Sequence, residues 1–504
     1  MCTKLVIAGS VSGIGIVLVA LGAGLGWGLF PGVIESEITK NLILSMGSAS
    51  YENWVKLPQP MEFKVYIMEV ENPDEVHAGA KPKMKETGPF VYLETKEKEN
   101  VVFSEDGETV EFEQRTFFAF SPELSGALSE NQEVTVLNAA LMGMMLTPEA
   151  DDAAGISIGL AAGYQFLFDN PETVFTTVKV RDLLFDGVLV RCDDSSSDLS
   201  WAAVCFGLST QELPPALRYD PESGNYFYSF FNHKNGKTDG HFKVSTGKSD
   251  ILKIGEILEW ENSAVLPYWS GPECNVIRGS DATIFPPFKT RDTKVYVFTT
   301  DLCRSIYLSY DKDIDHEGIY GYRYVVDEDQ LGNVTDQPDN YCFCPPNGAC
   351  LHRGAMDLTT CFNGPVILTL PHFYQAPDYE KLVEGMRPNK EDHQIYLDME
   401  MNSGAPLSAG RRVQFNMMIK PVRRFGITKD LPVAVVPLLW VNEALTLNEE
   451  NTNMLREALI NNLIIVDGVR WGLVGAGAAA FVAGAALFFV WRGSSKKSGG
   501  RRHS

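Results

Sequence analysis

The sequence predicts an α+β protein, in which a large extracellular body rich in antiparallel strands is held in a membrane by one apolar helix at each end. Three observations support this: uncharged apolar runs near both ends, period-two alternation in many segments between them, and an even number of cysteines in that intervening region. Of the 504 residues, 45% are hydrophobic and 21% charged, which excludes a disordered or collagen-like chain. The net charge of −22 argues against a sequence-independent nucleic-acid-binding protein, because such proteins need a basic face.

Two apolar runs predict the membrane helices. The first covers residues 5–30 and the second residues 471–491, and neither contains a charged residue. At about 1.5 Å per residue, each is long enough to cross a hydrocarbon core of roughly 30 Å. A cleaved signal peptide is the alternative for the first run, but its apolar core would be shorter, and no small-x-small cleavage site precedes Pro31. We therefore expect an uncleaved signal anchor and a stop-transfer helix.

Basic residues beside the two runs predict the orientation. Residues 1–4 and 492–504 hold six Lys or Arg and no acid, whereas residues 5–491 hold 37 bases and 65 acids. By the positive-inside rule, both tails are cytoplasmic and residues 31–470 are extracellular, which indicates the plasma membrane. Neither run contains an ionisable residue, which disfavours a conducting pore. A two-span ligand-gated channel with a cysteine-rich ectodomain remains the less favoured alternative.

The cysteine count agrees with an oxidising compartment. Cys2 lies in the short N-terminal tail, where it is either a palmitoylation site or a reduced thiol. Six of the eight others fall between residues 274 and 361, and paired C-x-x-C spacing is absent, so disulfides are favoured over a zinc site. We expect no metal and no cofactor. Eight cysteines allow 105 connectivities, and their spacing does not choose among them. Asn333-Val-Thr335 is a predicted glycosylation site.

The ectodomain contains no internal repeat or low-complexity linker, so one large domain is expected. Several segments alternate as strands do and are separated by Gly, Pro, Asp and Asn. They are MEFKVYIMEV, TVEFEQRTFFAF, KVYVFTT, YGYRYVV, HQIYLDMEM and RRVQFNMMI.

Residues 130–190 differ from this pattern and predict an inserted helical segment. Ile156, Leu160, Tyr164 and Leu167 recur at helical spacing, and DNPETVF predicts a further helix capped by Asn170. Another helical stretch, NEENTNMLREALINNL, precedes the second apolar run.

The inserted segment also has an unusual charge pattern. Residues 116–178 hold eight acids and no Lys or Arg, which predicts a surface that repels polyanions and anionic lipid. Met142, Met144 and Met145 lie in the same stretch and are either core residues or an adaptable apolar mouth for a lipid. Together with Leu160 and Tyr164, they are the candidates for the site where a ligand gains access.

The motifs that resemble catalytic sites lack the structural context that catalysis requires. Gly155-Ile-Ser157-Ile-Gly159 matches G-x-S-x-G, but no strand precedes it and Ser157 falls in a helical pattern, so a chance match is expected. His233 and His241 flank a turn without a third ligand, which favours a surface hairpin. Within the first apolar run, Gly22 with Gly26 and Gly24 with Gly28 could form helix contacts or act as spacers. No enzymatic activity is predicted.

The chain resembles the class B scavenger receptors, and most closely the insect sensory neuron membrane proteins among them. The resemblance runs through nearly the whole chain, and the combination of GSDATIFPPF, DLCRS and the CFC cluster is its most specific part. The other matching stretches are KETGPFVYLE, VRDLLFDG, GAMDLTTC, LPHF, RRVQFN and PLLWVNEAL, while ITKDLP and the pair Cys192/Cys205 favour the sensory subfamily.

The resemblance implies a β-barrel-like ectodomain with an internal tunnel and a membrane-distal helical apex at about residues 130–190. It also implies the disulfides Cys274–Cys342, Cys303–Cys361 and Cys344–Cys350 within the cluster 274–361, and leaves Cys192 and Cys205 to pair with each other.

Glu443 matches an acidic position of the family, for which a structural hydrogen bond is expected. Ala282 stands where the family usually has glycine. The basic residues that lipoprotein- and fatty-acid-binding relatives carry at the apex are absent, so uncharged long-chain esters, alcohols or aldehydes are the expected ligands.

The sequence therefore predicts a chemosensory co-receptor of the plasma membrane, placed in a sensory dendrite or cilium. It would capture hydrophobic semiochemicals, with an odorant carrier protein and an olfactory receptor-channel as partners. The alternative is a general scavenger or lipid-uptake receptor of haemocytes or gut.

Overall fold

The computed structural model describes residues 2–150, 154–193, 199–345 and 350–499. The chain divides into two compact units. The helical unit comprises Met1–Leu42, Glu317–Ile319 and Leu447–Ser504, and the barrel unit comprises Ile43–His316 and Tyr320–Thr446.

The helical unit consists mainly of two long apolar helices. One is built from α1 (Cys2–Ala23), a π-helical turn η1 (Gly24–Leu29) and α2 (Phe30–Leu42), and the other from α12 (Glu449–Leu455), η9 (Arg456–Ile460) and α13 (Asn461–Gly499). The segments Thr3–Leu42 and Glu449–Gly493 are long and apolar enough to cross a membrane. Both helices extend beyond the predicted spans 5–30 and 471–491. The helical stretch predicted before the second span is confirmed, and it comprises α12, η9 and the first residues of α13.

Glycines bring α1 and α13 together within the helical unit. A Cβ on Gly15 would lie 2.6 Å from the carbonyl oxygen of Gly477, and one on Gly477 would lie 2.7 Å from the backbone nitrogen of Val19. Gly22 and Gly26 also face α13, whereas Gly24 and Gly28 have nothing within 4 Å. The contact interpretation is therefore right for the first pair and wrong for the second. Small residues stabilise such helix pairs because the backbones can approach closely.

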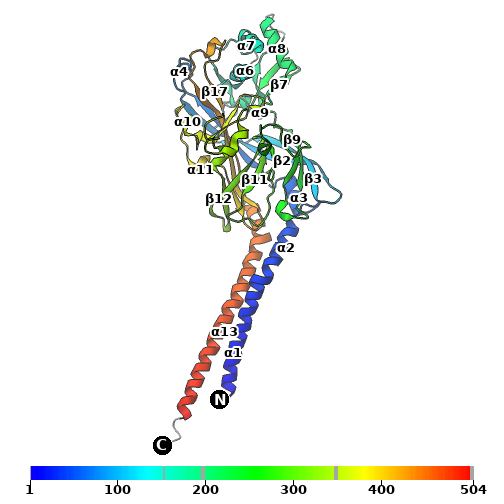
Figure 1. Cartoon of the computed structure of the whole chain (residues 1–504), viewed down its shortest axis with the longest axis vertical. Helices are drawn as coiled ribbons and strands as arrows, with labels where there is room; N and C mark the ends of the chain where they lie inside the picture. The colour runs from blue at the N-terminus through cyan, green and yellow to red at the C-terminus, as the bar shows by residue number, and fades with distance from the viewer. Residues whose placement is uncertain (1, 151–153, 194–198, 346–349, 500–504) are drawn as a thin grey trace. The chain divides into compact units, whose positions relative to one another are not determined.

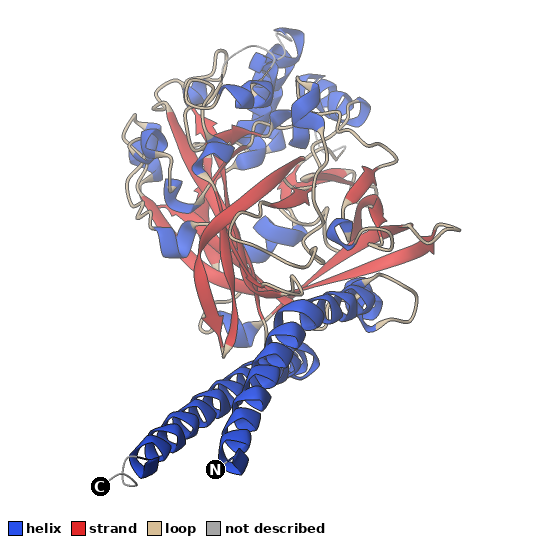
Figure 2. Ribbon diagram, turned by 60° about the horizontal axis from the view of Figure 1, so that its bottom comes forward, coloured by secondary structure: helices blue, strands red, loops and turns tan. Residues whose placement is uncertain are grey.

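The barrel unit is organised around one large antiparallel sheet, whose strands curve around the unit (Figure 2). Along the sheet the order is β10-β9-β3-β2-β1-β18-β17-β16-β13-β12-β11, with β14 and β15 added beside β17. These strands are β1 (Met61–Val70), β2 (Met84–Phe103), β3 (Thr109–Phe120), β9 (Lys237–Ser245), β10 (Ile257–Trp260), β11 (Val295–Thr299), β12 (Arg304–His316), β13 (Ile319–Val326), β14 (Ala355–Asp357), β15 (Ile367–Thr369), β16 (Tyr396–Glu400), β17 (Pro406–Ile419) and β18 (Ala434–Thr446). All six strands predicted by alternation are confirmed; β13 begins one residue and β17 five residues before the predicted segment.

Two residues close the sheet into a barrel. The backbone N–H of Ile257, in the outermost strand β10, donates to the carbonyl of Gly279 at 2.9 Å. The N–H of Phe298, in the opposite outermost strand β11, donates to the carbonyl of Ser280, also at 2.9 Å. Gly279 has φ +84°, and a Cβ there would lie 2.0 Å from the carbonyl oxygen of Tyr296, so the bridge requires glycine. The sheet consequently has no free edge along this part of its length.

A segment with three longer helices interrupts the strands between β3 and β9. It contains α6 (Ala139–Ala150), α7 (Ala154–Leu167) and α8 (Leu199–Thr210), which gather at one end of the barrel unit with β7 (Figure 1). We call this the helical end, and the opposite end, where β1 begins and β18 finishes, the Met61 end. The same segment holds two small sheets, one of β4 (Glu133–Leu137) and β5 (Phe175–Lys179) and one of β6 (Val188–Val190), β7 (Leu217–Asp220) and β8 (Asn225–Tyr228).

The helix predicted from DNPETVF is wrong. Asp169 and Asn170 have φ of +55° and +53°, which ends α7 instead of starting a new helix. The following residues form β5, in which Phe175 pairs with Leu137 of β4. The run Phe-Thr-Thr-Val consists of aromatic and β-branched residues, and their strand preference outweighs the capping signal.

Short helices complete the barrel unit. They are α3 (Ala49–Val55), α4 (Pro73–His77), α5 (Pro122–Ser125), α9 (Thr359–Phe362), α10 (Pro377–Glu380) and α11 (Lys390–His393), with a π-helical turn η2 (Asp182–Asp186) and six 3₁₀ turns among the described residues: η3 (Ile251–Lys253), η4 (Pro272–Asn275), η5 (Glu328–Leu331), η6 (Pro338–Phe343), η7 (Pro371–Phe373) and η8 (Gly426–Thr428).

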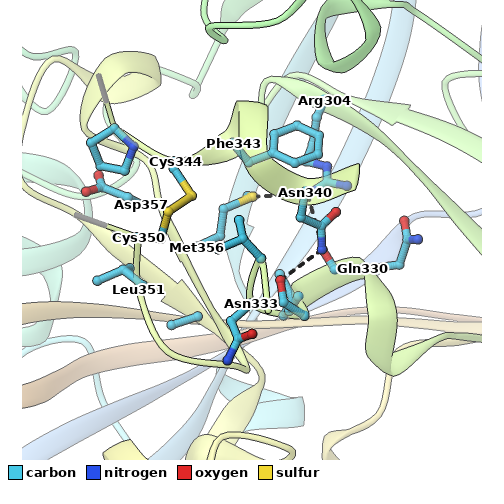
Figure 3. Close-up of a pocket in the computed structure, with 15 residues that line it drawn as sticks. Arg304, Gln330, Asn333, Asn340, Phe343, Cys344, Cys350, Leu351, Met356 and Asp357 are labelled. Carbon is cyan, nitrogen blue, oxygen red and sulfur yellow. Dashed lines mark hydrogen bonds between the residues drawn. A yellow bond between two sulfur atoms is a disulfide. The ribbon is translucent and has the colours of Figure 1, made fainter. Parts of the chain in front are cut away.

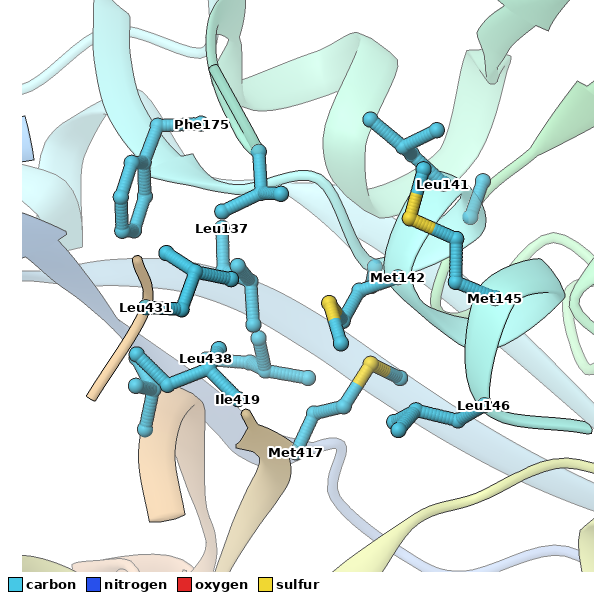
Figure 4. Packing of buried hydrophobic residues seen from close by; sticks show 14 of the residues in the cluster. Leu137, Leu141, Met142, Met145, Leu146, Phe175, Met417, Ile419, Leu431 and Leu438 are labelled. Carbon is cyan, nitrogen blue, oxygen red and sulfur yellow. The ribbon is translucent and has the colours of Figure 1, made fainter. Parts of the chain in front are cut away.

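The largest hydrophobic cluster joins the helical end to the sheet. Met142 and Met145 of α6 are buried among Met417 and Ile419 of β17 and Leu438 of β18, and Figure 4 shows the side chains of Met142 and Met417 close together. Flexible thioethers fill such irregular gaps well. The core-packing interpretation thus describes these methionines.

Replacing Gly477 tests the helix contact. We expect Gly477→Leu to separate the two apolar helices, because the new side chain would meet the backbone of α1, whereas Gly475→Leu faces open space and serves as the matched control. The measurement is the crosslinking yield of Trp27→Cys with Trp471→Cys, whose native rings lie 5.4 Å apart, in a chain that also carries Cys2→Ser. A severalfold loss is expected for Gly477→Leu alone; equal yields in both variants would contradict the contact.

Candidate functional site

A cavity of about 230 Å³ lies inside the barrel unit. On β17 the lining residues are Pro406 at the start of the strand and then, in the period-two pleat, Ala409, Arg411, Val413 and Phe415. At about 3.3 Å per residue, Pro406 and Phe415 lie roughly 30 Å apart along the strand. The cavity is therefore long and runs along the barrel wall from the Met61 end.

The cavity can hold a long-chain molecule. A buried water needs about 10–15 Å³ measured in this way, so there is room for on the order of fifteen to twenty water-sized groups. Part of the wall is aromatic, with Tyr228, Phe230 and Phe231 from the inserted segment and Phe118 from β3. An apolar wall of this kind favours a ligand with a hydrocarbon body.

Seven charged side chains lining the cavity form an unbroken row of ion pairs, which we call the ionic belt. In order, it consists of Asp239, Lys234, Asp301, Arg411, Glu443, Lys96 and Glu94.

The belt is held together by close contacts at its centre. Arg411 donates to Asp301 at 2.5 Å and, through Nε, to Glu443 at 2.6 Å. Lys96 Nζ donates to the other oxygen of Glu443 at 2.5 Å and lies 3.3 Å from Glu94. Glu443 thus has the structural hydrogen-bonding role expected for it. Because these groups are removed from bulk water, each depends on its neighbours for charge compensation.

The two glutamates of the belt differ in pKa. Burial and the neighbouring Glu443 carboxylate raise the pKa of Glu94, more than Lys96 and Arg411 lower it. Burial acts the same way on Glu443, but there the two cations dominate and hold its pKa well below the usual range. Glu443 is therefore a permanent anion, whereas Glu94 takes up a proton readily.

The GSDATIFPPF segment supplies part of the same wall. Asp281 forms an ion pair with the buried Lys98 at 3.0 Å, and Ala282, Thr283 and Phe285 also line the cavity. Ala282 has φ +66°, a left-handed conformation in which a Cβ is strained. The alanine that replaces the usual glycine thus adopts a glycine-like backbone conformation.

The ligand-access candidates lie elsewhere. Met142, Met145, Leu160 and Tyr164 are at most 8% exposed and belong to the core cluster, against which the partly buried Met144 packs. None of the five lines the cavity. Their role as a ligand mouth remains a prediction that their burial does not support.

The surface-hairpin interpretation of His233 is wrong, because its side chain lines the cavity. Burial lowers the pKa of His233 to about 4, so its ring is neutral at pH 7, and Nδ1 has no hydrogen-bond partner. His241 lies in β9 beside Glu111 and is partly exposed. Gly155–Gly159 lie inside α7, with no strand before them; the side chain of Ser157 is outside the described residues.

Four disulfides staple the barrel unit: Cys192–Cys205, Cys274–Cys342, Cys303–Cys361 and Cys344–Cys350. These are the pairs that the resemblance implies. In the described part of the chain, no cluster of His, Cys, Asp or Glu could hold a metal ion.

A second, much smaller pocket lies beside Cys344–Cys350 (Figure 3). Arg304 is buried there with its guanidinium 3.6 Å from the Phe343 ring centre, and it donates to the carbonyl of Gln330 at 3.2 Å. Burial lowers the pKa of Arg304 to about 10. With about 30 Å³, this pocket has space for roughly two waters and not for a lipid.

Sequence reasoning missed the ionic belt. Glu94 and Lys96 alternate with Thr95 and Glu97, so charge occurs on both faces of β2 and the pattern does not reveal which face is inside. Arg411 is likewise indistinguishable from its neighbour Arg412. Only the strand register, which places Arg411 opposite Glu443, shows that the charges meet.

A disulfide-stapled barrel unit and two apolar terminal helices are the architecture of a membrane-anchored receptor. Residues 13–488 match the CD36 family, and the chain belongs to that family, which is a family of receptors. It is 32% identical to sensory neuron membrane protein 2 of Drosophila melanogaster, over 96% of this chain and 97% of that protein. It is 34% identical to sensory neuron membrane protein 1 of Apis mellifera (97% and 92%) and to sensory neuron membrane protein 2 of Heliothis virescens (86% and 84%).

The strained alanine in the cavity wall gives a stability test. We expect Ala282→Gly to raise the free energy of unfolding by about 0.5–1 kcal/mol, because relief of left-handed strain exceeds the added entropy of the unfolded chain. Ala264, which is exposed and lacks a positive φ, is the control, and Ala264→Gly should be neutral or destabilising. Denaturant titration of the purified protein measures both. A loss of stability in Ala282→Gly would show that the alanine side chain contributes packing that outweighs its strain.

Proposed function

We propose that this receptor captures hydrophobic semiochemicals, such as pheromone-like long-chain esters, alcohols and aldehydes, and passes them through the barrel to the membrane or to an olfactory receptor-channel. The single observation that carries the proposal is the long apolar cavity inside the barrel unit. Each buried methylene contributes about 0.8 kcal/mol, so an alkyl chain gains strongly from entering before the entropic costs are counted. The sensory names of the similar proteins support the sensory role.

The charge of the inserted segment supports uncharged ligands. Glu123, Glu133, Asp169 and Glu172 are exposed there, and residues 116–178 contain no Lys or Arg. Such a surface repels fatty-acid anions and anionic particles but not neutral esters or alcohols.

The proposal includes a topology and a location. Both tails are cytoplasmic, the barrel unit is extracellular, and the receptor lies in the plasma membrane of a sensory dendrite, where an odorant carrier protein delivers the ligand. Asn333 carries the glycan; its Oδ1 accepts from the backbone N–H groups of Thr335 and Asp336, and neither hydrogen bond uses Nδ2.

Blocking the cavity tests ligand capture. We expect Ala409→Trp to abolish saturable binding of hexadecyl acetate, because the indole would fill the lumen between β17 and its neighbours. Ala119→Trp, at an exposed strand position, should bind like the unmodified chain. Binding is measured on the full chain in nanodiscs, with thermal unfolding as the folding check. Unchanged binding by a folded Ala409→Trp protein would contradict capture in this cavity.

A further inference from the structure

We propose that the Glu94 end of the ionic belt is a binding site for the uncharged, hydrogen-bonding head group of a long-chain ligand: an alcohol, an aldehyde or an ester. The inference rests on the proposed function, because it assigns the ligand class of the same cavity. The head group would lie at the belt while the hydrocarbon body follows the apolar wall.

Glu94 is the open end of the row of ion pairs. Its side chain lines the cavity and is 2% exposed, yet its Oε2 has no hydrogen-bond partner. The other carboxylates are satisfied: Glu443 accepts from Lys96 and Arg411, and Asp301 accepts from Arg411 and Lys234. A buried polar atom without a partner costs about 1–3 kcal/mol, so a ligand that supplies the missing hydrogen bond gains affinity there.

The charge balance of the belt selects the head group. Four carboxylates face three cations, which leaves one surplus negative charge. A proton on Glu94 removes this surplus without a counter-cation, and burial together with Glu443 favours that proton by raising the pKa of Glu94. The protonated carboxyl donates to the carbonyl oxygen of an aldehyde or ester, and the ionised form accepts from an alcohol. A fatty-acid anion would instead bring an uncompensated negative charge to the belt, whichever form Glu94 takes.

The wall on either side of the belt suits the rest of such a ligand. On β17, Ala409 lies on the Met61 side of Arg411, and Val413 and Phe415 lie on the helical side. A chain attached to a head group at the belt therefore meets apolar side chains in either direction. His233, whose Nδ1 is also without a partner, lines the same cavity and offers a second neutral polar atom.

The test compares sixteen-carbon probes that differ only in their head group. Hexadecanol, hexadecanal, hexadecyl acetate, hexadecane, palmitate and hexadecylamine are titrated against the full chain in nanodiscs at neutral pH. We expect the alcohol, aldehyde and acetate to bind about tenfold more tightly than hexadecane and palmitate, the ratio expected for one buried hydrogen bond.

Two substitutions separate the hydrogen bond from the charge. Glu94→Leu should lower the affinity for the three uncharged polar probes to that for hexadecane. Glu94→Gln keeps hydrogen-bonding atoms and removes the surplus charge. This variant should keep its affinity for hexadecanol and raise its affinity for palmitate severalfold. Glu99→Gln, at a partly exposed position of the same strand where Glu99 pairs with Arg115 outside the belt, is the control and should leave the ranking unchanged. If Glu94→Leu fails to fold, the change in palmitate affinity of Glu94→Gln still tests the head-group site.

The outcomes distinguish this site from ligand capture itself. Equal affinity for hexadecane and hexadecanol in the unmodified chain, or an unchanged ranking in folded Glu94 variants, would overturn the head-group site while capture stands. Tightest binding of hexadecylamine or palmitate would overturn it as well. Binding of none of the six probes would contradict the proposed function.

Discussion

Closing an antiparallel sheet requires its two outermost strands to be joined, and in this chain Gly279 and Ser280 join them. The bridge works because one residue has no side chain: a Cβ on Gly279 would overlap the carbonyl of Tyr296. Without the bridge, β10 and β11 would present unpaired backbone groups, and the cavity would have no continuous wall. The closure is thus the constraint on which both the lumen and its lining depend.

The enclosed lumen places charged groups where little water can solvate them. Their arrangement in ion pairs offsets this desolvation cost. Isolated buried charges are strongly unfavourable, whereas a row in which Arg411 and Lys96 alternate with carboxylates compensates most of them. The compensation is incomplete only at Glu94, where an oxygen lacks a partner. The residue with the uncompensated desolvation cost, Glu94, is therefore also the residue that we propose selects the ligand head group.

Most of the framework could be predicted from the sequence, because apolar length, strand alternation and cysteine parity are local signals. The strand at Met61–Val70 was predicted to the residue. The error at Asn170 arose because a cap-like Asn-Pro pair preceded a strongly β-forming run, whose pairing with β4 is non-local. The position of His233 and the belt could not be predicted for a related reason. Which face of a strand points inward depends on the strand register and on closure of the barrel, and a strand with charge on both faces does not indicate either.

The disulfide between Cys303 and Cys361 lies two residues along the chain from Asp301, a central member of the belt. The covalent bond holds the turn that presents this carboxylate to Arg411 and Lys234. The disulfide therefore restricts the backbone from which Asp301 reaches the belt. A secretory compartment that oxidises cysteines thereby also fixes one side of the charged interior.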